Sequence, residues 1–215
     1  SVTGLVDAGN LKTNAGAKAG DKLILTKGLG VGMLAAALKR DLGAAKDLAS
    51  LTESLTQTNA VGNELGGIAG VHAMTDVTGF GLAGHLLEIC RASGVAARIQ
   101  GSTLPKIAAA EAWAASYVLP DNAMRNWNAF ESAVDMQDAS AFTWLVDPQT
   151  SGGLLISVAD TAISEVEAAL RAASLFYCQF LALFVAGLLL RISKKLLQQI
   201  GRGFGCFLVD TSQTL

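Results

Sequence analysis

The sequence predicts an α/β fold in the broad sense, a mixed β-sheet flanked by helices. Short apolar runs of strand length alternate along the chain with longer segments in which apolar residues recur at helical spacing. Glycine-containing turns separate the two kinds of segment. With 215 residues, the chain is long enough for one domain with a substantial core and a short appendage.

The first strand–helix pair lies near the start of the chain. Lys22–Thr26 has the length and composition of a buried strand, and Met33–Arg40 consists of strong helix formers. The turn between them, Gly28–Gly32, invites a dinucleotide-binding interpretation, but the third glycine of that fingerprint would have to stand where the methionine at position 33 is. We therefore expect this turn to serve tight strand–helix packing. A surface helix is predicted over Asp41–Ala60 and a glycine-rich loop over Val61–Gly70.

The second strand–helix pair surrounds an aspartate. A short apolar strand ends at Asp76, the turn Gly79-Phe80-Gly81 follows, and a helix then begins whose apolar face consists of Leu82, Leu86, Ile89 and Cys90. Gly94 is placed to end this helix in the left-handed conformation. A carboxylate at such a turn can hold a hard cation such as Mg²⁺, and the free N–H groups of a helix start suit phosphate oxygens. The alternative is an ordinary connection, in which the aspartate caps the helix and the glycines supply positive φ.

The alternation continues after this helix. Val95–Ile99 is a further strand, and a helix is expected to start at Thr103-Leu104-Pro105, run over Ile107–Tyr117 and end at Pro120-Asp121. Within the following segment, Asn122–Asp138, the aromatic residues Trp127 and Phe130 are expected to pack in the core or in a lid.

A second polar loop follows. Phe142–Val146 is strand-like, Gln149–Gly153 is a compact loop, and Leu154–Val158 is strand-like again. The loop offers hydroxyl and N–H groups that could meet phosphate or bound water, but its residues are also those of a plain hairpin turn. Asp160 is then expected to cap a helix whose apolar face consists of Ile163, Val166 and Leu170. Glu167 and Arg171 are expected to form an ion pair one turn apart on the same helix.

Composition excludes some functions and indicates the cellular compartment. A net charge of −2 with 16% charged residues leaves no basic surface for nucleic acid. The three cysteines form no Cys-x-x-Cys pair, so neither a disulfide framework nor a zinc site is expected, and no signal peptide is expected. We therefore expect a cytoplasmic protein. The only histidines are His72 and His85, no nucleophilic triad is expected, and His85 is interpreted as packed or solvent-facing rather than bound to phosphate.

Two blocks of sequence resemble a known family. The Asp76 block, Met74-Thr75-Asp76-Val77-Thr78-Gly79-Phe80-Gly81 with Gly84-His85-Leu86 and Glu88 after it, resembles a signature of selenophosphate synthetase (selenide, water dikinase). The Asp147 block, Asp147–Ile156, resembles that family's other carboxy-terminal signature. The resemblance runs from about residue 1 to residue 173. It implies the fold of the carboxy-terminal domain shared by the aminoimidazole ribonucleotide synthetase-like superfamily.

The resemblance also implies which residues form the site. Asp76 matches the metal aspartate that this domain contributes to a Mg²⁺–ATP site, and the neighbouring and loop residues expected to shape the cofactor site are Thr75, Thr78, Gly79, Gly81, Thr150, Ser151 and Gly152. Asp147 belongs to the second of these signatures, and the resemblance assigns it no individual role. No catalytic residue is expected in this chain, because the family's Cys or selenocysteine and its lysine lie in the amino-terminal half. The implied substrates are ATP and selenide, and the implied full-length enzyme is a homodimer.

Residues 174–215 fall outside the resemblance and are predicted as a divergent tail. Leu175–Leu190 is a nearly continuous apolar run with Arg191, Lys194 and Lys195 after it. It could be a membrane anchor, a helix packed on the domain, or the product of a frameshift or intron. We favour the last, because the match stops abruptly, and we expect the domain to lose a sheet element.

Two functions remain open on the sequence. The first is an ATP-dependent phosphotransferase that makes selenophosphate, present here as an incomplete carboxy-terminal part. The start at Ser1 rather than at methionine favours a fragment or a processed product. The alternative is a non-catalytic truncated domain that binds a partner synthetase or is inactive.

Overall fold

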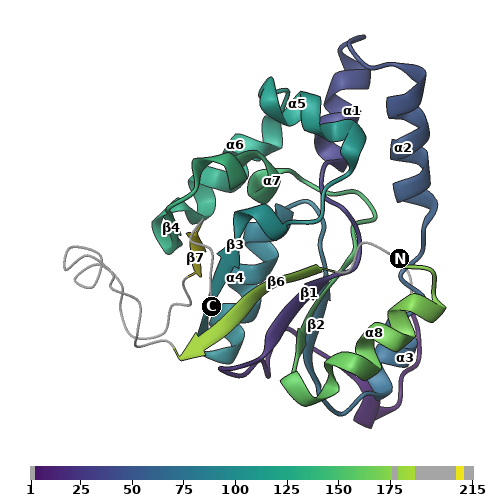
Figure 1. The fold of residues 1–215 in the computed structure, drawn as a ribbon, viewed down its shortest axis with the longest axis vertical. Helices are drawn as coiled ribbons and strands as arrows, with labels where there is room; N and C mark the ends of the chain where they lie inside the picture. The colour runs from purple at the N-terminus through teal and green to yellow at the C-terminus, as the bar shows by residue number, and fades with distance from the viewer. Residues whose placement is uncertain (1–2, 176–178, 187–206, 211–215) are drawn as a thin grey trace.

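The computed structural model describes residues 3–175, 179–186 and 207–210, which form a seven-stranded mixed sheet with helices around it (Figure 1). The strands lie in the order β2-β5-β1-β6-β3-β7-β4. The pairings from β2 to β3 are antiparallel, and β7 is parallel to both β3 and β4. The bounds are β1 (Lys22–Leu25), β2 (Val71–Asp76), β3 (Val95–Gln100), β4 (Val134–Met136), β5 (Leu154–Val158), β6 (Gln179–Ala186) and β7 (Phe207–Asp210).

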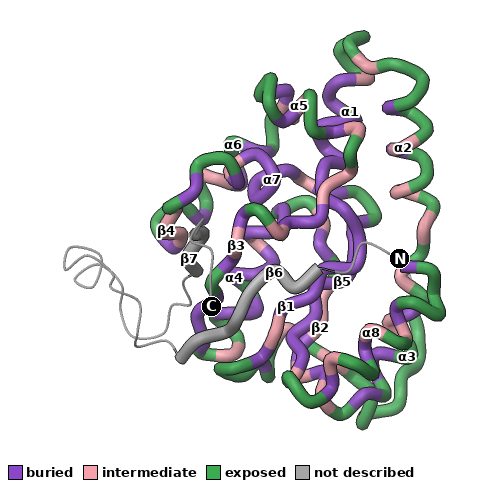
Figure 2. Tube along the Cα trace, viewed as in Figure 1, coloured by how far each residue is buried: buried purple, intermediate pink, exposed green. Residues whose placement is uncertain are grey.

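Helices pack against both faces of the sheet. They are α1 (Val31–Lys39), α2 (Ala45–Thr56), α3 (Gly62–Gly67), α4 (Gly81–Ser93), α5 (Glu111–Ala115), α6 (Asp121–Phe130), α7 (Phe142–Val146) and α8 (Ile163–Ala172). In β1, Leu23 and Leu25 belong to a core shared with α1 and α4, whereas Ile24 belongs to a core shared with α3 and α8. This is the two-residue period of a strand. Figure 2 shows buried residues concentrated along the strands and on the inward sides of the helices.

The elements around Asp76 are confirmed. The strands expected near residues 22–26, 71–76, 95–99 and 154–158 are β1, β2, β3 and β5. The whole predicted apolar face of α4 is buried, and Gly94 ends the helix at φ 67°. Phe130 is buried and Trp127 contacts both Phe130 and Phe142 edge-on, so the packing interpretation of these aromatics is confirmed.

The strand expected at Phe142–Val146 is wrong, because these residues form the short helix α7. Aromatic and β-branched residues favour a strand only where a pleated surface receives them. Here Thr143, Trp144, Leu145 and Val146 are buried against α4 and α6, and tertiary packing decides the local structure. The helix matters for the site, because Asp147 follows it directly.

Several boundaries also differ from expectation. The segment Val61–Gly70 contains α3 rather than loop alone, and the helix expected from residue 103 is reduced to the 3₁₀ turn η3 (Ala108–Ala110) and α5. A helix begins after Pro120 where one was expected to end, since a proline suits the residues just before a helix as well as those after it. Ala162, not Asp160, stands at the N-cap of α8. The pair of Glu167 and Arg171 is confirmed at 3.3 Å.

Part of the apolar tail is a central strand. Residues 179–186 form β6 between β1 and β3, so the expected loss of a sheet element is wrong, as are the two helical alternatives for these residues. A continuous apolar run is also the pattern of a strand covered on both faces. Residues 176–178 and 187–190 of that run lie outside the described residues. Among the helices that the structure describes, none is long and apolar enough to span a membrane. The boundary at residue 173 stays a prediction.

Candidate functional site

The two motif blocks lie side by side at one end of the sheet. Strands β2 and β5 are antiparallel neighbours, and Asp76 pairs in register with Leu154. Beyond the paired strands, the backbone N–H of Gln149 donates to the carbonyl of Thr78 at 3.0 Å. The sheet therefore brings the Asp76 block and the Asp147 block, which are about 70 residues apart in sequence, onto one surface.

Asp76 is the last residue of β2, and its side chain is exposed. Thr75 and Thr78 are half-buried beside it, and Gly79 is exposed. Among the described residues, no group of three or more His, Cys, Asp and Glu side chains could hold a metal ion. One exposed carboxylate still fits Mg²⁺ as a partial site, because this ion keeps several waters and takes one or two carboxylates together with substrate phosphates.

Two glycines are required by close packing between the blocks. Gly81 begins α4 at φ 70°, and a Cβ on it would lie 2.7 Å from the carbonyl oxygen of Leu145. A Cβ on Gly152 would overlap the carbonyl of Val77. Both glycines are buried, so they shape the surface through backbone contacts.

The tip of the Asp147 block is anchored by a lysine. Thr150 and Ser151 are exposed, and Ser151 has φ 51°. Lys27 Nζ donates to the carbonyls of Ser151 at 2.7 Å, Gln57 at 2.5 Å and Ser54 at 3.4 Å, the last two at the C-terminal end of α2. A cation is favourable at a helix C-terminus, and three acceptors match the three donors of an ammonium. Burial lowers the pKa of Lys27.

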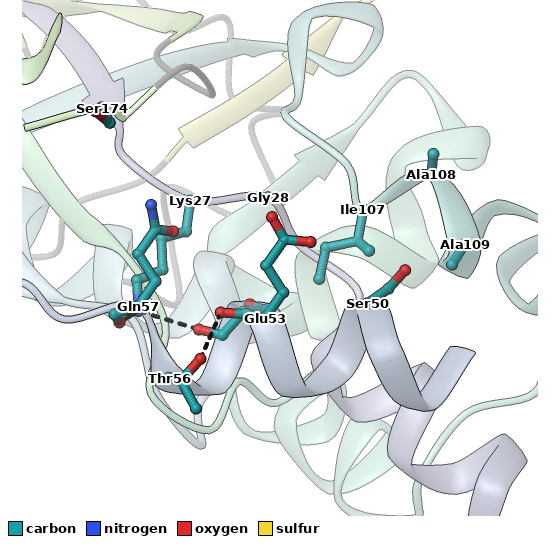
Figure 3. A pocket seen from close by; sticks show the side chains of 11 residues that line it. Lys27, Gly28, Ser50, Glu53, Thr56, Gln57, Ile107, Ala108, Ala109 and Ser174 are labelled. Atoms are coloured by element: carbon teal, nitrogen blue, oxygen red, sulfur yellow. Dashed lines mark hydrogen bonds between the residues drawn. The ribbon is translucent and has the colours of Figure 1, made fainter. Parts of the chain in front are cut away.

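A pocket of about 540 Å³ opens beside Lys27 (Figure 3). One wall is a single face of α2, and the opposite wall comes from η3 and the residue before it. Figure 3 shows Ser50 and Glu53 extending from α2 toward the segment that carries Ile107. The pocket has the size of a small-molecule site and adjoins the Asp147 block through Lys27. No motif in the sequence marks it.

Asp147 joins its block to the start of α1. The side chain is fully buried, and Oδ2 accepts the N–H of Gly32 at 3.0 Å and Nε2 of Gln149 at 2.8 Å. Gln149 Oε1 in turn accepts the N–H of Val31 at 3.3 Å. Burial raises the pKa of Asp147 to about 7, although these hydrogen bonds oppose the shift. The Asp147 side chain thus occupies the anion-binding position of α1. A Cβ on Gly30 would lie 2.5 Å from Cβ of Ala110 and one on Gly32 2.5 Å from Oδ1 of Asp147, so the tight packing expected of the turn Gly28–Gly32 is confirmed.

Two residues that were not among the predicted site residues contact the Asp76 turn. Asn126 of α6 is buried, and its Nδ2 donates to the carbonyls of Gly79 at 2.9 Å and Val146 at 3.1 Å. It therefore ties the Asp76 turn to the residue before Asp147. His85 of α4 is buried, and its Nε2 lies 3.1 Å from Thr78 Oγ1. His85 was expected to be packed or solvent-facing, and it is packed.

Replacing Asn126 with alanine is expected to lower the free energy of unfolding by about 1–2 kcal/mol, because the carbonyls of Gly79 and Val146 both lose their donor and the bond to Val146 is buried. Urea denaturation measures this change. Asn122→Ala on the exposed side of the same helix is the control and should change stability by less than about 0.5 kcal/mol. Equal stability losses in both variants would contradict the role of Asn126.

Known proteins match this chain in sequence. The model of the family "AIR synthase related protein, C-terminal domain" matches residues 18–182. A selenide, water dikinase of Dechloromonas aromatica is 48% identical over 166 residues, which cover 76% of this chain and 48% of that protein. The selenide, water dikinase of Paraburkholderia xenovorans is 46% identical over 172 residues, covering 79% and 49%. The chain thus spans about half the length of these curated relatives.

Solved structures match in fold. Thiamine-monophosphate kinase from Stenotrophomonas maltophilia superposes with a TM-score of 0.64 at 17% identity, over 94% of this chain and 54% of that one. Hydrogenase maturation protein HypE from E. coli superposes with a TM-score of 0.62 at 23% identity, over 81% and 47%. A complex of HypE with ATP gives 0.61 at 15% identity, over 81% and 45%. These likenesses confirm the expected α/β fold.

Proposed function

This chain belongs to the family of C-terminal domains of AIR synthase related proteins, and we propose that it acts in an ATP-dependent phosphotransferase that makes selenophosphate from selenide, ATP and water. It would supply about half of the enzyme, with the remainder of the active site on the other half. A homodimeric whole enzyme and a cytoplasmic location are parts of the same proposal.

The meeting of the two motif blocks around Asp76 is the observation that carries this proposal. Neither block alone is specific, because each could be an ordinary turn. Their backbones hydrogen-bond to each other, and they leave one carboxylate exposed at the strand end next to the start of α4. Together with the identity to selenide, water dikinases, this arrangement favours a phosphate-handling surface.

The chain's own residues would bind and orient the nucleotide. Asp76 would hold Mg²⁺ as one of its ligands, and when bound the ion would neutralise charge on phosphoryl oxygens. The start of α4 would direct backbone N–H groups toward phosphate. The residues that would shape this cradle are Thr75, Thr78, Gly79, Gly81, Thr150, Ser151 and Gly152.

Replacing Asp76 with asparagine is expected to weaken the affinity of the chain for Mg²⁺–ATP by about tenfold or more, because a metal ligand loses its charge. Isothermal titration calorimetry measures the dissociation constant. Asp160→Asn is the matched control, since Asp160 is exposed and follows β5 at the opposite end of the sheet. Absence of Mg²⁺–ATP binding by the unaltered chain would favour the alternative, a non-catalytic domain.

Product formation gives a second readout of the same proposal. The chain alone should form no AMP from ATP and selenide, because the residues implied for catalysis lie in the other half of the family's enzymes. Fused to the complementary half of the Dechloromonas aromatica relative, it should form AMP only when selenide is present. A fusion that folds and binds ATP but stays inactive would overturn the proposed function.

A further inference from the structure

Three side chains, one from the turn after Asp76 and two from α4, form a chain of contacts into the candidate site. The Nε2 atom of His85 lies 3.1 Å from Oγ1 of Thr78. On the other side of the ring, Nδ1 lies 3.3 Å from Oε2 of Glu88, one helical turn further along. Thr78 is two residues after Asp76, so the hydroxyl end of this chain belongs to the surface proposed to meet phosphate.

The imidazole is enclosed. His85 is only 6% exposed, and the ring of Phe80 packs against it with centroids 5.8 Å apart. Its Nδ1 is a buried atom without an aligned hydrogen bond, although the Glu88 carboxylate is close. Buried polar atoms are nearly always satisfied in folded proteins, so each exception calls for an explanation, of which a chemical task is one. Apo active sites commonly show such loose contacts.

The position of Glu88 decides which nitrogen carries the proton. With the proton on Nδ1, the ring presents an N–H to the carboxylate; with the proton on Nε2, a lone pair would face that negative charge. The first arrangement is favoured, because like charges or lone pairs in contact are destabilising. It leaves the Nε2 lone pair to accept the hydroxyl proton of Thr78. This is the geometry of an oriented base acting on a hydroxyl.

The hydroxyl is not needed to hold the turn. The backbone carbonyl of Thr78 already accepts the N–H groups of Gly81 and Gln149, both at 3.0 Å. Asn126 separately holds the carbonyl of Gly79. These bonds fix the path of the Asp76 turn, so the contact between Thr78 and His85 is available for chemistry.

We propose that Thr78, His85 and Glu88 form a proton relay for the acceptor that attacks the phosphoryl group. This inference rests on the proposed phosphotransferase function. As the oxygen of water forms its bond to phosphorus, the bond from phosphorus to the leaving oxygen breaks and that oxygen keeps the electron pair. The proton of the water passes to Oγ1 of Thr78 while the proton of Thr78 passes to Nε2 of His85. Thr78 is the relay residue that contacts the reacting water, in addition to the catalytic residues implied for the other half. His85 takes up the proton through Thr78, and Glu88 is a positioning residue that stabilises the resulting imidazolium.

The tautomer of His85 can be tested on this chain without the fusion. Nitrogen-15 NMR of the imidazoles should show His85 protonated on Nδ1 with Nε2 as the acceptor, and Glu88→Gln should shift the population toward the other tautomer. The chain has two histidines, so a His72→Gln variant assigns the signals. A His85 protonated on Nε2 in the unaltered chain would overturn the relay.

The function of the relay is tested in the fusion with the complementary half of the Dechloromonas aromatica relative. Thr78→Val should lower kcat for AMP formation about 100-fold while KM for ATP changes less than about threefold. Thr78→Ser, which keeps the hydroxyl, should recover kcat to within about fivefold of the unaltered fusion. If the unaltered fusion is active and the Thr78→Val variant has the same kcat, the relay is overturned while the proposed function stands. An inactive unaltered fusion would overturn the proposed function, and with it the reaction that the relay serves.

Discussion

Replacing Asp147 with asparagine is expected to remove a pH dependence of stability that the unaltered chain shows between about pH 4 and pH 7. Burial raises the pKa of Asp147 in the folded chain to about 7 from an ordinary value of 3.8. Between these two values the folded state keeps a proton that the unfolded state has released. The free energy of unfolding therefore falls as pH rises, by up to about 1.4 kcal/mol per pH unit. Above pH 7 both states are ionised and this contribution is flat.

The asparagine variant isolates this effect because it cannot ionise. The asparagine oxygen can take the place of Oδ2 and accept both the N–H of Gly32 and Nε2 of Gln149. Its amide nitrogen would then stand at the position of Oδ1, which is buried without a hydrogen-bond partner, so some absolute stability should be lost. The decisive quantity is therefore the slope, measured by urea denaturation at about pH 5, 6 and 7. Asp160→Asn, an exposed carboxylate, should keep the slope of the unaltered chain. A slope in the Asp147→Asn variant equal to that of the unaltered chain would contradict the buried, protonated carboxyl.

The contacts of Asp147 also show which parts of the fold local sequence can predict and which it cannot. The strand before Asp76, the helix after it and its capping glycine follow from spacing and turn chemistry, and all three are present. The partner of Asp147 is the start of α1, which precedes it by more than 100 residues. No local pattern contains that contact. The glycines of Gly28–Gly32 alone therefore invited a nucleotide-binding interpretation, whereas the partner of this turn in the fold is the side chain of Asp147.

Other misses have the same origin. Asn126 lies among polar residues that are typical of a surface, and it becomes a site residue only because α6 packs beside the Asp76 turn. The contact of Thr78 with His85 depends on the tight turn that starts α4. Continuous apolar runs are ambiguous between a buried helix and a central strand, and the pairing of β6 with β1 and β3 resolves the case of residues 179–186.

Of two glycines in one turn, replacement by alanine should destabilise the fold at Gly81 and leave its stability nearly unchanged at Gly79. Gly81→Ala is expected to lower the free energy of unfolding by about 3 kcal/mol, since an alanine at φ 70° is strained and its Cβ would press on the carbonyl of Leu145. Gly79→Ala should leave stability within about 0.5 kcal/mol, because no atom lies within 4 Å of a Cβ at that position. Urea denaturation of both variants measures the contrast.

Ligand binding then separates the role of the turn in the stability of the fold from its role in binding phosphate. If phosphate approaches the backbone at Gly79, the stable Gly79→Ala variant should bind Mg²⁺–ATP about tenfold more weakly than the unaltered chain, because the new methyl group occupies the space of the ligand. Gly67→Ala on α3, where a Cβ also meets nothing within 4 Å, controls for the added methyl group and should bind normally. Unchanged affinity in Gly79→Ala would place the ligand away from this turn, whereas stability equal to that of Gly81→Ala would mean that Gly79 is needed for the fold instead.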